Sequence, residues 1–130
     1  MIVVDASALL EVLLRTPGAE SVERALSGSS LSLHAPHLID VEAAQVIRRY
    51  AASGQIGEAR GREALVDLAE FPMRRYPHDV LLQRIWDLRN NMTAYDAAYV
   101  ALAEALGAAL LTRDQRLAAA ARQHTRVELA

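Results

Sequence analysis

Short runs of consecutive apolar residues alternate along this chain with longer stretches in which apolar residues recur every three or four positions. The runs MIVV at residues 1–4 and AALLT at residues 108–112 have the pattern of strands that are buried on both faces of a sheet. The longer stretches have the period of amphipathic helices. The pattern predicts strands at residues 1–4, 31–34, 73–76, 108–112 and 126–129.

Capping and breaking residues predict where the helices begin and end. Ser7 is expected to cap a first helix, and Pro36 fits the first turn of a long one. Gly54 and Gly107 are expected to end helices, and Gly28-Ser29-Ser30 is predicted to be a turn. The predicted helices cover residues 8–15, 18–27, 36–53, 57–70, 78–89, 93–106 and 113–123.

This alternation of strands and helices is typical of β-α-β units. Such units give a mainly parallel sheet with helices on both faces, because each parallel crossover packs a helix back onto the sheet. We therefore predict an α/β fold of three layers, α/β/α, with a central sheet of four to five strands. A chain of 130 residues can build one real core, so we predict a single domain over residues 1–130.

The composition excludes several classes of protein. The chain has no cysteine, which excludes a disulfide framework, a thiolate zinc site and a cysteine nucleophile. It has no lysine either, so it lacks the residue that a P-loop nucleotide site or a Schiff base requires. We interpret the four histidines as ordinary polar residues rather than metal ligands, and the formal net charge of −2 does not by itself indicate nucleic acid.

The chain shows no sign of membrane insertion or export. No apolar stretch approaches the roughly 18 residues that span a bilayer. The first apolar run follows no basic segment and is interrupted by Asp5, which argues against a signal peptide. We predict a cytoplasmic protein without membrane contact.

Two aspartates follow predicted strands directly. Asp5 ends the first strand, and Asp114 lies two residues after the strand at 108–112. In open parallel sheets, ligands bind outside the carboxyl ends of the strands, and both aspartates belong to that edge. The alternative for each is a helix N-cap or a first-turn acid.

Two further acids interrupt the apolar faces of predicted helices. Glu42 falls within the apolar stripe of the helix at 36–53, whereas Asp40 and the pair Arg48-Arg49 fit its solvated face. Asp96 shares its face with apolar residues one and two turns later. The alternatives are an ion pair of Glu42 with an arginine and a capping box of Asp96 with Thr93.

These four acids can converge on one cleft. Close ionised carboxylates repel each other by about 4 kcal/mol per pair at an effective dielectric near 20, so they either take up protons or bind a cation. A site made of oxygen atoms favours Mg²⁺ or Mn²⁺, and acid clusters that hold such ions catalyse hydrolysis of phosphodiester bonds. The rest of the chain carries a net positive charge, so arginines at the rim can contact phosphates.

Three segments together resemble PIN-domain ribonucleases of the VapC toxin type. They are MIVVDASALLEVLL at the start, PHLIDVEAAQVIRR in the first third, and RNNMTAYDAAYVALAEALGAALLTRDQRLAAAA near the end. The resemblance spans nearly the whole chain and is most specific in TAYDAAYVALAE followed by LLTRD, whereas residues 54–90 match only loosely. It implies a PIN fold and a Mg²⁺- or Mn²⁺-dependent endoribonuclease that cleaves by direct attack of water.

The resemblance also implies roles for individual residues and partners. Asp5 and Asp96 match the family's metal ligands, Glu42 and Asp114 complete its acidic pocket, and Ser7 and Thr112 match its supporting hydroxyls. The implied partners are an RNA substrate, a VapB-type antitoxin and a second copy of the chain in a homodimer.

Two predictions concern contacts outside the acidic pocket. Arg89 and Arg113 flank the candidate site in sequence, and we predict that they contact phosphates of the substrate. The first helix has more apolar positions than a short helix usually buries, so an antitoxin segment is expected to cover the surplus. These positions are Leu9, Leu10, Val12, Leu13 and Leu14.

Two other functions remain open at this point. One is a non-catalytic module that binds RNA or protein on the same fold, and the other is a nuclease that acts on DNA. The four acids favour an enzyme over a binding module, because a binding module has no need of carboxylates that repel each other.

Overall fold

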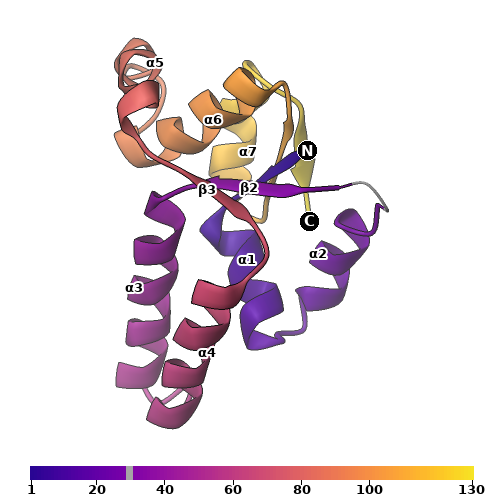
Figure 1. Cartoon of the computed structure of the whole chain (residues 1–130), viewed down its shortest axis with the longest axis vertical. Helices are drawn as coiled ribbons and strands as arrows, with labels where there is room; N and C mark the ends of the chain where they lie inside the picture. Colours follow the sequence, from indigo (N-terminus) through magenta and orange to yellow (C-terminus); the bar gives the residue numbers. More distant parts are fainter. Residues whose placement is uncertain (29–30) are drawn as a thin grey trace.

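The computed structural model describes residues 1–28 and 31–130, and its strands form one five-stranded parallel sheet. The strands lie in the order β3-β2-β1-β4-β5 (Figure 1). β1 and β4, the predicted apolar runs, are fully buried inside the sheet, whereas the edge strands β3 and β5 are partly exposed. The bounds are β1 Ile2–Val4, β2 Leu33–Pro36, β3 Arg74–Tyr76, β4 Ala109–Thr112 and β5 Val127–Leu129.

Helices cover both faces of this sheet. The chain crosses it in one direction from β1 to β3 and returns in the other direction to β4 and β5. Right-handed crossovers therefore place α1–α4 on one face and α5–α7 on the other (Figure 1). The predicted three-layer α/β/α fold is confirmed. The helices are α1 Ala6–Leu14, α2 Ala19–Ala25, α3 Leu38–Ala52, α4 Glu58–Glu70, α5 Leu82–Asp87, α6 Ala94–Leu106 and α7 Gln115–Ala121.

The boundary between β2 and α3 differs from the prediction. Pro36 ends β2 instead of opening the helix. A proline is tolerated there because the next residue makes the link to β3: the His37 N–H donates to the Tyr76 carbonyl at 2.8 Å. The predicted strand at 31–34 is therefore shifted toward Pro36, and α3 begins at Leu38.

The N-cap of α1 is Asp5, not Ser7. The backbone of Asp5 is extended, and its carboxylate accepts the Ala8 N–H at 3.0 Å. Ser7 lies in the first turn, where its hydroxyl is turned back toward that same carboxylate. The helix therefore begins two residues earlier than predicted.

Other predicted boundaries are close to those observed. Gly107 ends α6 with a φ of 61°, in the left-handed region that glycine adopts at helix ends. The segment predicted as one helix at 78–89 is divided into a 3₁₀ turn, η1 at Asp79–Leu81, and the short helix α5. The tight turn buries Leu81 in the core. Of the predicted turn at 28–30, Ser29 and Ser30 lie outside the described residues.

The apolar surplus expected on α1 is not at the surface. Leu9, Leu10 and Leu13 are buried, and Val12 and Leu14 pack partly buried against the same core. The reason is that α1 is enclosed, with α2, α3 and α4 packed around it next to the sheet. The expected surplus of exposed apolar positions on α1 is therefore wrong, whereas contact of an antitoxin segment with this helix stays a prediction.

No helix in residues 1–28 and 31–130 combines the length and apolarity that crossing a membrane would need. The cytoplasmic location stays a prediction.

Candidate metal-binding active site

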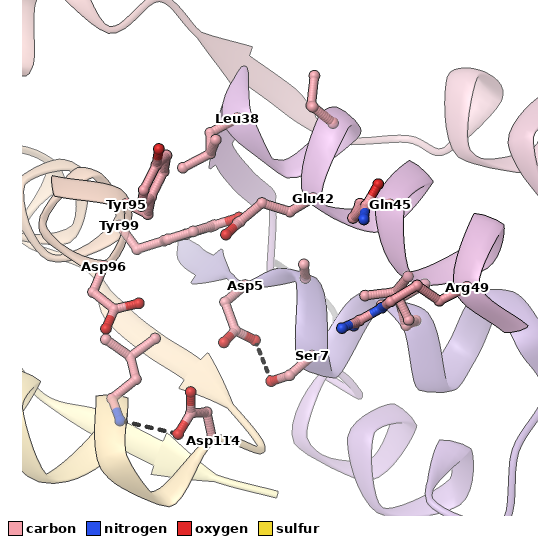
Figure 2. A pocket seen from close by; sticks show the side chains of 15 residues that line it. Asp5, Ser7, Leu38, Glu42, Gln45, Arg49, Tyr95, Asp96, Tyr99 and Asp114 are labelled. Carbon is pink, nitrogen blue, oxygen red and sulfur yellow. Dashed lines mark hydrogen bonds between the residues drawn. The ribbon is translucent and has the colours of Figure 1, made fainter. Parts of the chain in front are cut away.

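The carboxyl ends of β1 and β4 open into a cleft that is lined by all four acids singled out in the sequence (Figure 2). β1 and β4 are parallel neighbours, so Asp5 and Asp114 leave the sheet at the same edge. α3 brings Glu42 and α6 brings Asp96 to the walls. The cleft has a volume of about 480 Å³.

Asp5 is fixed at the base of the cleft by three hydrogen bonds. Its Oδ1 accepts from the Ser7 hydroxyl at 2.7 Å and from the Ala8 N–H at 3.0 Å, and its Oδ2 accepts from the Thr112 hydroxyl at 2.6 Å. Asp5 is only 5% exposed. The same carboxylate therefore caps α1 and is held in one orientation at the base of the cleft.

Ser7 and Thr112 tie Asp5 to the segment after β4. The Ser7 hydroxyl accepts the Arg113 N–H at 3.0 Å, and the Thr112 hydroxyl accepts the Asp114 N–H at 2.9 Å. Each hydroxyl thus donates to Asp5 while it accepts from the backbone that leads into α7. Both hydroxyls thus contact Asp5 directly, and their supporting role in the site stays a prediction.

Asp114 is both an N-cap and a cleft residue. Its Oδ1 accepts the backbone N–H groups of Arg116 and Leu117 at 2.9 and 3.2 Å, which caps α7. The two interpretations weighed for Asp114 in the sequence are therefore compatible.

Glu42 is held by a tyrosine. The Tyr99 hydroxyl donates to Glu42 Oε1 at 2.5 Å, and the Tyr99 ring is buried. No ion pair with an arginine is found for Glu42 among the described residues. The partner expected as the alternative is thus replaced by a neutral donor.

Asp96 projects from the first turn of α6. Its N–H donates to the Thr93 hydroxyl at 3.2 Å, so Thr93 caps the helix as predicted. Its carboxylate faces the cleft and lies 3.6 Å from a guanidinium nitrogen of Arg116, whose side chain is 76% exposed. The Asp96 carboxylate is therefore only partly neutralised.

Burial and mutual repulsion disfavour the ionised forms of these acids. Burial raises the pKa of Asp5 despite its hydrogen bonds from Thr112 and Ser7, and the charge of Asp114 raises it further. Burial also raises the pKa of Glu42, and the charges of Asp5 and Asp96 add to that. The pKa of Asp96 is raised by burial and by Asp114, while Arg116 opposes the shift.

The donor chemistry of the cleft fits a hard divalent cation. In residues 1–28 and 31–130 no three acidic or histidine side chains converge closely enough to share one ion. Mg²⁺ commonly takes only one or two protein carboxylates and fills its other positions with water or substrate phosphate. The four carboxylates that line one open cleft can meet that requirement.

The structure places the two predicted phosphate contacts differently. Arg113 forms an ion pair with Glu11 at 3.3 Å in a groove next to the cleft, so its guanidinium is engaged by a carboxylate of the protein itself. Arg89 lies outside the residues that line the cleft, with its guanidinium 4.3 Å from the ring centre of Trp86. Neither side chain points into the acidic cleft as the structure stands.

Sequence reasoning missed two residues of the cleft. Arg49 lines it although it was assigned to the solvated face of its helix, and Tyr99 binds Glu42. Both follow from helical spacing: Arg49 is two turns after Glu42, and Tyr99 is one turn after Asp96.

Two of the four histidines form hydrogen bonds of the kind expected for ordinary polar residues. His34 is hydrogen bonded to the Tyr76 hydroxyl at 2.6 Å, and His78 accepts the Leu38 N–H at 2.9 Å. Neither lines the acidic cleft.

Comparison with known proteins assigns the family. The model of the PIN domain matches residues 2–123. Ribonuclease VapC9 of Mycobacterium tuberculosis is 49% identical over 117 residues, which cover 90% of this chain and 88% of that relative. Ribonuclease VapC1 of the same species is 46% identical over 119 residues, with coverage of 91% and 89%. The chain belongs to the PIN-domain family, as the resemblance predicted.

Solved structures support the same fold. VapC20 of M. tuberculosis, described as a toxin that cleaves the sarcin-ricin loop, matches with a TM-score of 0.71 at 15% identity over 92% of this chain and 95% of that one. VapBC2 from Rickettsia felis matches with a TM-score of 0.70 at 10% identity over 100% and 99%. At such low identity the likeness concerns the fold.

We predict that removing the charge of Asp5 changes how stability depends on pH. Because the folded state raises the pKa of Asp5 above its ordinary value of 3.8, the folded protein holds this proton more tightly than the unfolded chain. The stabilising effect is complete at low pH and is lost as pH rises through the raised pKa. Without divalent ions, Asp5→Asn should therefore gain stability relative to wild type as pH rises from about 4 to 7.

Chemical denaturation in the presence of a chelator at several pH values measures this difference. Asn retains N-cap ability, so the cap itself is preserved. Asp87→Asn, at an exposed acid on α5, is the control and should show no such trend. A difference between Asp5→Asn and wild type that does not vary with pH would contradict the assignment.

Proposed function

We propose that this protein is a metal-dependent endoribonuclease of the VapC type, the toxin of a toxin–antitoxin pair, and that residues 1–130 act as one domain. The observation that carries the proposal is the meeting of four carboxylates from four separate places in the chain in one cleft. The relatives named VapC ribonucleases, which match over about nine-tenths of the chain, support RNA as the substrate.

In this proposal the acids hold a divalent cation, Mg²⁺ or alternatively Mn²⁺. Asp5 and Asp96 are its direct ligands, and Glu42 and Asp114 complete the acidic site. When bound, the ion activates water and offsets the charge that develops on the leaving oxygen. Ser7 and Thr112 keep the Asp5 carboxylate at a fixed angle through their hydrogen bonds.

The reaction is a hydrolysis without a covalent enzyme intermediate. Water adds to phosphorus in line with the bond to the 3′ oxygen, that bond breaks, and the products carry a 5′-phosphate and a 3′-hydroxyl. The chain's own contribution is to orient the phosphate beside the carboxylates and to keep Asp5 buried and ionised when the cation is present.

We assign the main phosphate contact within the cleft to Arg49. Its side chain lines the cleft two turns along α3 from Glu42. Arg113, in the adjoining groove that shares Ser7, Leu10 and Val46 with the cleft, is a second contact once it is released from Glu11. Arg89 does not line the cleft, so we expect any contact that it makes to be with another phosphate than the one that reacts.

We further propose a VapB-type antitoxin as inhibitor and a homodimer as the assembly. The antitoxin is supported by the VapC relatives and by the fold shared with VapBC2 of R. felis. α1 stays a candidate for part of the antitoxin surface, because Leu10 and Leu14 line the groove next to the cleft.

The first prediction from this proposal is that Asp96→Asn abolishes cleavage. The substitution removes one negative charge from the site but leaves the backbone N–H that Thr93 caps. Cleavage of RNA in Mg²⁺ should fall at least about 100-fold, beyond the 10–100-fold typical of outer-shell partners. An Asp96→Asn protein that cleaves as fast as wild type would show that the activity arises elsewhere.

The same assay separates the alternatives. A purified wild-type protein that binds RNA but leaves it intact in Mg²⁺ or Mn²⁺ would indicate the non-catalytic module. A preference for single-stranded DNA over RNA of the same sequence would indicate a DNA nuclease. Asp87→Asn, which lies outside the cleft, controls for a general effect of lost charge.

A second prediction concerns Arg49. Arg49→Gln should raise KM more than it lowers kcat, because the lost contact is to a phosphate that is bound both before and during the reaction. The slope of log(kcat/KM) against log salt should become shallower by about 0.7 for one contact to a single strand.

Arg48→Gln is the matched control for this change. It removes the same charge one residue earlier on α3, where Arg48 lines a groove against α4 rather than the acidic cleft. Equal effects of the two substitutions would mean that net charge, and not a contact in the cleft, governs RNA binding.

A third prediction tests the partner. The product of the adjacent open reading frame, produced together with this protein, should co-purify with it and suppress RNA cleavage. If excess Asp96→Asn protein, added as a competitor for the antitoxin, restores cleavage by the wild type, the complex is reversible. Separate elution of the two proteins together with undiminished cleavage would contradict the antitoxin proposal.

A further inference from the structure

α6 contributes two side chains to the acidic cleft, one of which has no charge. Asp96 lies in its first turn, and Tyr99 lies one turn further along the same face. The Tyr99 ring is 2% exposed, and its hydroxyl reaches across to Oε1 of Glu42 on α3 (Figure 2). This contact links the helices that form two walls of the cleft.

Glu42 needs such a contact to stay in place. A glutamate side chain has three rotatable torsions, and holding it in one conformation costs rotamer entropy. Figure 2 shows the carboxylates of Asp5 and Asp96 on the side toward which Glu42 extends, and their charges act on Glu42, so repulsion favours rotamers that move it away from them. Among the described residues, the Tyr99 hydroxyl is the donor that opposes this motion.

The donor itself is fixed. The Tyr99 ring belongs to the core packed between α6 and the sheet, so the hydroxyl cannot follow Glu42 outward. Because the ring is held by the surrounding core, the phenol oxygen keeps a fixed position beside Glu42. The remaining oxygen of Glu42, Oε2, is left without a hydrogen bond in the part of the chain that the structure describes.

We infer that Tyr99 is a positioning residue, which holds the Glu42 carboxylate in the cleft against the repulsion of Asp5 and Asp96 so that it can take part in binding the cation. This inference rests on the proposed function. It gives α6 two roles, because the helix supplies one acid directly and also orients the acid of the facing helix.

The test is Tyr99→Phe, which removes the hydroxyl and keeps the ring. We expect the folded protein to bind Mn²⁺ more weakly by about 10–100-fold in calorimetry, which is the loss typical of outer-shell partners. The Mn²⁺ concentration for half-maximal RNA cleavage should rise by the same factor, with a smaller change in the rate at saturating metal.

Tyr76→Phe is the matched control. It also removes a tyrosine hydroxyl that is hydrogen bonded to a side chain, His34 at 2.6 Å, but on β3 and outside the residues that line the cleft. It should leave Mn²⁺ affinity unchanged even where it lowers the unfolding temperature. An equal loss of Mn²⁺ affinity in both variants would overturn the inference.

A double-mutant cycle distinguishes positioning from packing. If Tyr99 acts through Glu42, Tyr99→Phe should have no further effect on Mn²⁺ affinity in a Glu42→Gln background. Additive losses would show that Tyr99 acts through the core instead, and would overturn the inference while the proposed function stands. A wild-type protein that neither binds Mn²⁺ nor cleaves RNA would overturn both.

Discussion

The charge of Asp5 is the constraint around which the rest of the site is organised. A carboxylate that is almost fully buried is costly unless donors or a cation compensate for lost hydration. Here the sheet topology supplies the donors, because β1 and β4 are parallel neighbours and bring Ser7 and Thr112 to opposite oxygens of Asp5. These hydroxyls are in turn oriented by the backbone of residues 113 and 114, so the position of Asp5 depends on pairing between segments more than a hundred residues apart.

The other acids add repulsion to this buried charge, and the protein limits it by different means. Tyr99 supplies a neutral donor to Glu42, and Arg116 supplies a largely exposed cation to Asp96. Neither removes the negative potential of the cleft. The fold thus gathers the acids in one cleft without neutralising them, which favours the binding of a divalent cation there.

Much of the fold could be predicted from local sequence, and the predictions that were wrong share one cause: they depended on contacts between distant segments. The buried strands β1 and β4 are short continuous apolar runs, and the two ends of α6 are marked by the capping residues Thr93 and Gly107. Pro36 is compatible with a strand end and with a helix start, and the choice was made by pairing of β2 with β3, which no local pattern contains. The excess of leucine on α1 could not be assigned to core or surface before the positions of α2, α3 and α4 were known.

The site shows the same division. All four acids could be found because each interrupts an apolar pattern or follows a strand. Arg49 and Tyr99 lie at helical spacing from Glu42 and Asp96 but do not stand out, since an arginine on a helix surface and a tyrosine in an apolar stripe are what any helix contains. Proximity in sequence was misleading for Arg113: its backbone N–H does reach the site through Ser7, but its guanidinium turns to Glu11.

The double use of Asp114 links the final helix to the integrity of the cleft. One of its oxygens is occupied by the first N–H groups of α7, and the side chain is presented to the cleft from that same turn. Unwinding of this turn would withdraw an acid and loosen the backbone that orients both hydroxyls at Asp5. Folding of the first turn of α7 and the geometry of the acidic cleft are therefore coupled, so a change that destabilises this turn would also disturb the cleft.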